Sequence, residues 1–124
     1  MKSYSLNEND QILILTAIGK QSLKDIIDHY LYLSKTNDLP KDLKCLIDCR
    51  EAIFELDHNE LNFTTKSVNL ALQNYDRINE AILVEKPFET VIANLFEELN
   101  APLENYTFQV FSTEEAALNW LKNM

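Results

Sequence analysis

Residues 12–18 read ILILTAI and precede Gly19, the only glycine of the chain. Successive side chains of a strand point to opposite faces, so this run is apolar on both of its faces. The segment AILVE at residues 81–85 has the same character. Strands without a polar face are typical of parallel sheets, which are normally covered on both sides. The two segments therefore predict an α/β protein with a largely parallel sheet.

Segments with helical spacing alternate with these strands. Ser22 and Asp25 form a capping box at the start of the first of them. Helices are predicted at residues 23–35, at about 62–76, from Pro87 to about 99, and after Ser112. Further strands are predicted at 3–6, 44–49 and 106–111, the first of them at an edge. The expectation is an α/β fold: one domain over residues 1–124, a mostly parallel sheet with an antiparallel N-terminal edge strand, and four helices.

The strand order decides where the helices lie. Connections between parallel strands are right-handed, so strands that follow one another in sequential order place their helices on one face of the sheet. The other face of the strands at 12–18 and 81–85 would then be apolar and in need of a partner. The sequence leaves this question open.

Charge and composition exclude several classes of protein. The chain has 20 acidic and 11 basic residues and a net charge of −9, the wrong sign for nucleic acid or for an anionic membrane. The first ten residues lack the apolar stretch of a secretory signal, and residues 12–18 are too short to span a bilayer. We expect a cytoplasmic protein without membrane insertion.

Cys45 and Cys49 are the only cysteines. On one strand they would lie about 13 Å apart, too far to form a disulfide or to share a metal ion. We expect two buried, reduced side chains. An alternative is a reactive thiol at Cys49, because neighbouring Arg50 could lower its pKa.

No catalytic, metal or cofactor signature stands out. With glycine only at position 19, neither phosphate-binding glycine motif can be built. His29 is expected on a partly exposed helix face without a specific role. His58 lies in an acidic connection, and no second histidine or CxxC motif supports a metal site there.

The segment VFSTEEAALNWL at residues 110–121 resembles the end of the SpoIIAA-like (STAS/SEC14-type) family, with Glu115, Ala117, Trp120 and Leu121 in its final helix. A strand that ends in Asp48-x-Arg50 and the order of elements agree with this resemblance. It implies a non-enzymatic module. In STAS relatives that antagonise anti-sigma factors, a phosphorylated serine at the start of the second helix controls binding to a kinase-like protein.

The chain departs from those relatives where the serine would lie. Asp48 is followed by Cys49 and Arg50 rather than by a D-S-S-G-like turn. Candidate phosphoacceptors near the start of the second predicted helix are Thr64, Thr65 and Ser67, where free N–H groups would favour a phosphate. Hydroxyl groups at such positions also serve as plain caps.

We therefore expect a regulatory or scaffolding module that contacts another protein, with a homodimer as one form of that contact. The contact surface is expected at residues 50–67 and the neighbouring strand ends, with the binding candidates Asp48, Cys49, Arg50, Phe54 and His58. Phe54 either packs onto the domain or offers an apolar contact. The alternatives are a carrier of a small apolar ligand held between helices and sheet, and an enzyme that uses Cys49 with Arg50.

Overall fold

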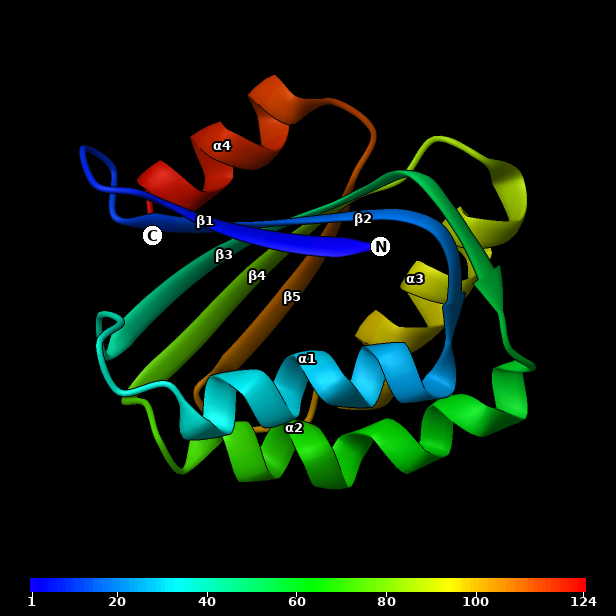
Figure 1. Ribbon diagram of the computed structural model, residues 1–124, viewed down its shortest axis with the longest axis horizontal. Coiled ribbons are helices and arrows are strands. Elements are labelled where there is room, and N and C mark those ends of the chain that lie inside the picture. Colours follow the sequence, from blue (N-terminus) through cyan, green and yellow to red (C-terminus); the bar gives the residue numbers. More distant parts are fainter.

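The structure, a computed structural model, describes residues 1–124 and contains five strands and four α-helices (Figure 1). In chain order the elements are β1 (Lys2–Asn7), β2 (Ile12–Ser22), α1 (Leu23–Lys35), β3 (Asp42–Glu55), the 3₁₀ helix η1 (His58–Phe63), α2 (Thr64–Leu72), β4 (Arg77–Leu83), α3 (Pro87–Asn100), β5 (Tyr106–Phe111) and α4 (Glu114–Lys122). No helix combines the length and the apolar character that crossing a bilayer requires.

The strands form one sheet in the sequential order β1-β2-β3-β4-β5. β1 pairs with β2 in antiparallel fashion, and every other neighbouring pair is parallel. The predicted mostly parallel sheet, with its antiparallel N-terminal edge strand and four helices, is confirmed.

The sequential order also explains how the helices are distributed. α1, α2 and α3 each lie within a right-handed connection between neighbouring parallel strands, so they share one side of the sheet (Figure 1). α4 follows the last strand, is free of that constraint, and covers the opposite face. Between α4 and the sheet lies a small apolar cluster, formed by Ala117 and Leu121 of α4 with Ile12, Leu46, Ala81 and Leu83 of the strands. The second apolar face is thus covered in part by the chain's own last helix.

β3 is longer than the sequence predicted, because it continues to Glu55 instead of ending at residue 49. Residues 50–55 were expected in a connection, yet they pair with β2 as far as Ser22. Their burial alternates strictly, with Ala52 and Phe54 inside and Ile53 exposed. Gly19 does not end β2. It adopts φ +80° inside the strand, a conformation that glycine reaches without strain, close to a register shift between Thr16 and Ile18.

Two other boundaries differ from the expectation. The second predicted helix is divided into η1 and α2, and α2 ends at Leu72. β4 begins at Arg77 rather than at residue 81. The residues missed at its start include Asn79 and Glu80, which are polar but fully buried. Their polar character led the sequence analysis to leave them out of the predicted strand. They are buried because other elements of the fold pack around them.

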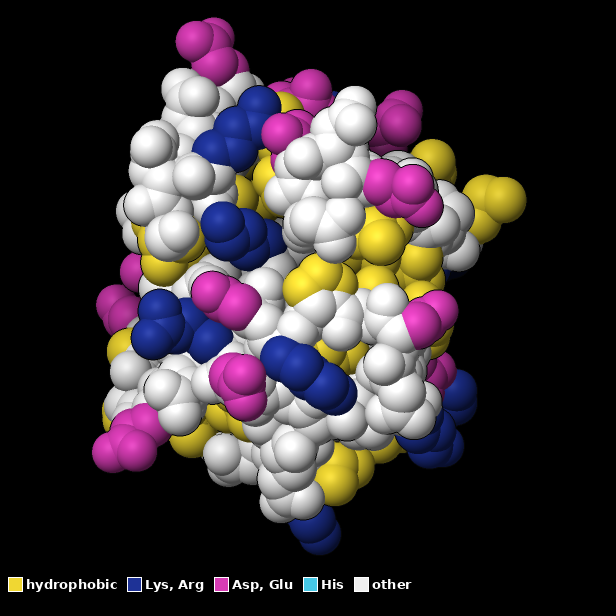
Figure 2. Space-filling view, turned by 90° about the vertical axis from the view of Figure 1, so that its left-hand side faces the viewer, with side chains coloured by type: hydrophobic (Ala, Val, Ile, Leu, Met, Phe, Trp, Pro, Cys, Tyr) yellow, Lys and Arg dark blue, Asp and Glu magenta, His cyan; other side chains and the backbone are white.

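Figure 2 shows the end of the molecule at which β3, β4 and β5 begin. Acidic and basic side chains are interspersed on this face, with hydrophobic side chains between them. Charged side chains of the two signs are therefore not separated on this face, despite the net charge of −9.

The substitution Leu121→Ala tests how much the packing of α4 on the sheet contributes to stability. The Leu121 side chain is fully buried against the sheet, so Leu121→Ala should lower the free energy of unfolding by about 2–5 kcal/mol. Asn119→Ala on the exposed side of α4 is the matched control and should change it by less than about 0.5 kcal/mol. Urea unfolding measures both. Equal effects would mean that α4 does not pack on the sheet as described.

Candidate functional site

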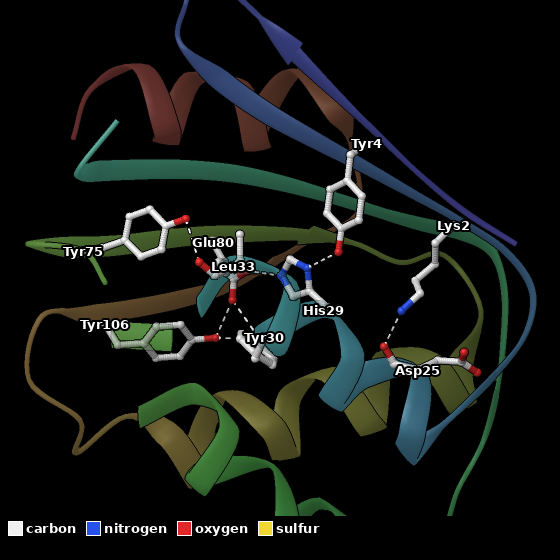
Figure 3. Close-up of polar contacts among 9 residues, drawn as sticks. All are labelled: Lys2, Tyr4, Asp25, His29, Tyr30, Leu33, Tyr75, Glu80 and Tyr106. Carbon is white, nitrogen blue, oxygen red and sulfur yellow. Dashed lines mark hydrogen bonds and ion pairs between the residues drawn. The ribbon is translucent and has the colours of Figure 1, made fainter. Parts of the chain in front are cut away.

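A cavity of about 70 Å³ lies between the sheet and the helix layer of α1 and α3. Its walls are mainly apolar and include Leu15, Ile47, Ile82, Phe96 and Phe108. The lining residues that are partly exposed are Lys2, Asp25 and Ile26, so the cavity reaches the surface between β1 and the first turn of α1. Lys2 donates a hydrogen bond of 2.6 Å from Nζ to the backbone oxygen of Asp25 across this mouth (Figure 3).

A buried carboxylate, Glu80 on β4, is the centre of a polar cluster beside the cavity. Its side chain has no exposed surface. Oε1 accepts hydrogen bonds from the hydroxyl groups of Tyr106 at 2.6 Å and Tyr30 at 2.8 Å, and Oε2 lies 2.7 Å from His29 Nε2 (Figure 3). Both carboxylate oxygens therefore have partners, which offsets the cost of removing the group from water.

His29 links this carboxylate to the edge strand. Its Nδ1 lies 2.8 Å from the Tyr4 hydroxyl, and its Nε2 faces Glu80. In the tautomer with its proton on Nε2, His29 donates to Glu80 and accepts the Tyr4 proton at Nδ1. The expectation of a partly exposed His29 without a specific role was wrong, because its exposed fraction is 4%.

Burial keeps the surrounding groups protonated. Burial, and then the charge of Glu80, raises the pKa of Tyr30 and that of Tyr106 well above their usual value. The same two causes raise the pKa of the Cys45 thiol, which is paired in register with Glu80 on the neighbouring strand. All three groups therefore remain hydrogen-bond donors or neutral neighbours at physiological pH.

Hydrogen bonds join Tyr4 to His29 and His29 to Glu80, in the order in which a catalytic triad joins its nucleophile, its base and its orienting acid. Its electrostatics do not fit that role. Burial, together with the nearby thiol of Cys45 and the carboxylate of Glu80, raises the pKa of the Tyr4 hydroxyl, whereas an activated nucleophile needs a lowered pKa. The hydrogen bonds link β1 and α1 to β4.

Asp48 and Arg50 form a bidentate ion pair in the middle of β3. Arg50 donates from Nε to Oδ1 at 3.0 Å and from Nη2 to Oδ2 at 2.8 Å. The guanidinium lowers the pKa of Asp48. Arg50 also lies 3.8 Å from Glu114 at the start of α4. Asp48 and Arg50, both predicted as binding candidates, are thus paired with each other.

Cys49 points to the other side of the sheet and lines the cavity. Burial, and then the carboxylate of Asp48, raises the pKa of its thiol to about 12. The alternative of a thiol activated by Arg50 is therefore wrong: the guanidinium is engaged with Asp48, and the thiol is hidden.

The other candidates do not converge on one site. Phe54 is buried and lines the cavity, so its packing alternative is confirmed. His58 is 67% exposed and lies 3.5 Å from the Asp57 carboxylate, away from the cavity. Thr64 and Ser67 are buried, and each hydroxyl donates to a backbone oxygen one turn earlier, so neither is an accessible phosphoacceptor as predicted. Thr65 is partly buried and donates to Asn100 Oδ1.

Sequence reasoning missed the groups that the fold brings together: Tyr4, His29, Tyr30, Cys45, Glu80 and Tyr106. A usable signal existed in the segment INEAIL at residues 78–83, where an acidic residue directly precedes an apolar run. A carboxylate inside a buried parallel strand needs donors from other elements. The tyrosines and histidine were the available donors.

Tyr106→Phe removes one donor from Glu80 and leaves the ring in place. The unfolding free energy should fall by about 1–3 kcal/mol, because a buried carboxylate oxygen loses a charge-assisted hydrogen bond. Tyr32→Phe, on the exposed side of α1, should leave stability unchanged. Urea unfolding of the three proteins checks this, and a Tyr106→Phe protein as stable as the unaltered chain would show that this hydrogen bond does not stabilise the fold.

No protein-family model matches the sequence, and no curated protein matches it. Among solved structures, the chain is similar to the crystal structure of an uncharacterized protein from the DUF3478 family with a SpoIIAA-like fold, from Shewanella loihica PV-4. The similarity covers 98% of this chain and 92% of that one, with a TM-score of 0.56 and 19% sequence identity. Identity this low carries the fold and not the activity. With its sequential five-stranded sheet and four helices, the chain has a SpoIIAA-like fold, as the resemblance implied.

Proposed function

We propose that the protein is a non-enzymatic regulatory or scaffolding module that works by protein contact, and that its contact partner is a second copy of the chain. The observation that supports this best is a groove of about 440 Å³ on the outside of α1 and α2. Its apolar residues are Ile27, Leu31, Phe63 and Leu70, and its polar ones are Lys66, Ser67, Asn69 and Gln73.

The groove exposes apolar surface that the fold leaves without a partner. Phe63 is 67% exposed and Leu70 is 43% exposed, although both belong to a segment whose inner side is buried. Apolar side chains that gather in a polar-rimmed depression are typical of interaction sites. Residues 63–67 also fall within the contact surface expected from the sequence.

The charges in the groove are compatible with a second copy as the occupant. The chain carries a net charge of −9, so two copies repel each other over most of their surfaces. None of the eight groove residues is acidic, and Lys66 is the single charged residue among them. This is a surface on which two acidic molecules can approach without placing carboxylates against one another.

We propose a non-enzymatic protein because its candidate nucleophiles stay protonated. Burial raises the pKa of the Cys49 thiol to about 12 and raises that of the Tyr4 hydroxyl as well. Both cysteines are free, which suits the reducing cytoplasm in which we propose that the protein works.

The proposed dimer predicts that Phe63→Glu produces a monomer, because the substitution places a carboxylate in the apolar groove of both copies. Phe88→Glu is the matched control, since Phe88 is 51% exposed at the start of α3 and lies outside the groove. Size-exclusion chromatography with light scattering should give a dimer for the unaltered chain and for Phe88→Glu. A monomer in all three cases, over a range of concentrations, overturns the proposal.

The cavity supports a second function, the binding of a small apolar molecule between helices and sheet. Its size limits the ligand, because a dry cavity known to bind benzene has about 150 Å³ and this one has about 70 Å³. A lipid chain therefore requires the helices to move away from the sheet.

Native mass spectrometry of gently purified protein distinguishes the two functions. A bound small molecule that is lost when Ala17, at the cavity wall, is enlarged by Ala17→Leu would support ligand binding. The bare polypeptide mass in each case would argue against it and would leave the dimer prediction unaffected.

A further inference from the structure

Three buried side chains of the types that bind transition metals meet beside the cavity. His29 from α1, Cys45 from β3 and Glu80 from β4 each offer one ligand atom, and these atoms all lie within 4.8 Å of one another. All three residues are buried. The sequence places them far apart, and only the parallel pairing of Cys45 with Glu80 and the packing of α1 on the sheet unite them.

The groups around the three residues orient them as outer partners orient metal ligands. Tyr4 hydrogen-bonds His29 on Nδ1 and leaves Nε2 directed inward. Tyr30 and Tyr106 both hydrogen-bond Glu80 on Oε1 and leave Oε2 directed to His29 (Figure 3). A ligating histidine held through its second nitrogen and a ligating carboxylate held through its second oxygen are the usual arrangement in metalloproteins.

We propose that His29 Nε2, Cys45 Sγ and Glu80 Oε2 form a binding site for a divalent transition metal ion of the Zn²⁺ type. A nitrogen, a thiolate sulfur and a carboxylate oxygen are the three donor types that Zn²⁺ takes in proteins. Three protein ligands leave the fourth tetrahedral position to water or to another small donor.

The spacing fits after a small adjustment. Metal–ligand bonds of about 2.0–2.3 Å place the donor atoms of a tetrahedral site roughly 3.3–3.8 Å apart. His29 Nε2 and Glu80 Oε2 are 2.7 Å apart and share a hydrogen bond, and Cys45 Sγ lies within 4.8 Å of a ring nitrogen of His29 and of a carboxylate oxygen of Glu80. Replacing that proton by an ion requires shifts of about 1 Å or less, within the range of side-chain torsions.

The proton and charge balance is simple. The buried Cys45 thiol, whose pKa burial and Glu80 raise, loses its proton to solvent when its sulfur binds the ion. The proton of His29 moves from Nε2 to Nδ1, where the Tyr4 hydroxyl turns to accept it. The thiolate and the carboxylate then neutralise the double charge of the ion, so that the buried site is neutral overall.

The route to the site begins at the cavity. His29 lines the cavity and also belongs to the cluster, so an ion can reach the first ligand through the mouth between Lys2 and Asp25 once the hydrogen bond across that mouth opens. The exposed His58 and the surface carboxylates offer weaker sites, and the test must separate these from the buried one.

Co²⁺ is the suitable probe because thiolate ligation gives an intense ligand-to-metal charge-transfer band in the near ultraviolet, which oxygen and nitrogen ligands do not give. Co²⁺ is added to the folded chain after treatment with chelator, and in parallel is supplied to the expressing cells. Cys45→Ser removes the proposed sulfur ligand. Cys49→Ser is the matched control, since it alters the other buried cysteine of the same strand.

The expected result is one Co²⁺ per chain with a charge-transfer band that Zn²⁺ abolishes, that Cys45→Ser lacks and that Cys49→Ser retains. A His29→Gln protein should bind at least tenfold more weakly. Three results overturn the proposal: no band by either route of supply, a band that survives in Cys45→Ser, or only weak absorption of the kind given by surface carboxylates. Circular dichroism of each variant establishes that it is folded.

Discussion

The arrangement of the molecule depends on a carboxylate placed where water cannot reach it. Glu80 lies on the central part of the sheet with no exposed surface, and an unpaired charge there would cost several kcal/mol. Its partners come from α1 and β5, and through His29 the contact extends to Tyr4 on the edge strand. One buried group thus specifies how a helix and three strands lie relative to one another, a role that apolar packing alone fills less precisely.

The second constraint is the order of the strands. A sequential parallel sheet gathers its crossover helices on one side, and the large core forms there. The other side would expose apolar residues of the central strands. α4 returns across it and buries Ala117 and Leu121 against the sheet. The same topology leaves the outer surfaces of α1 and α2 facing solvent, and this is the surface that we propose for the second copy.

Two parts of the structure thus have different chemical characters. The interior concentrates titratable groups but keeps them neutral or paired, which is consistent with a structural role and with the proposed metal site. The exterior concentrates apolar side chains at one groove with no acidic residue in it. The two proposals rest on separate residues, so the failure of one leaves the other standing.

The alternation of apolar strands and amphipathic helices was sufficient to predict the fold class and the order of the elements, because both are consequences of local periodicity. The antiparallel edge strand followed from the short connection between the first two strands, which leaves no room for a crossover. The predicted strand boundaries were wrong where local hydropathy and burial disagree. Asn79 and Glu80 are polar but lie inside β4, and residues 50–55 resemble a connection but continue β3.

The candidate site shows the same division. Asp48 and Arg50 are two residues apart on one strand, and their pairing could be anticipated from sequence. The meeting of His29, Cys45 and Glu80 could not, because it depends on the register between β3 and β4 and on the rotation of α1. By itself, the sequence determined which segments are apolar and how they alternate. Only the tertiary structure decided which polar side chains are removed from water together, because hydrogen bonds between distant residues form only after the strands and helices have packed.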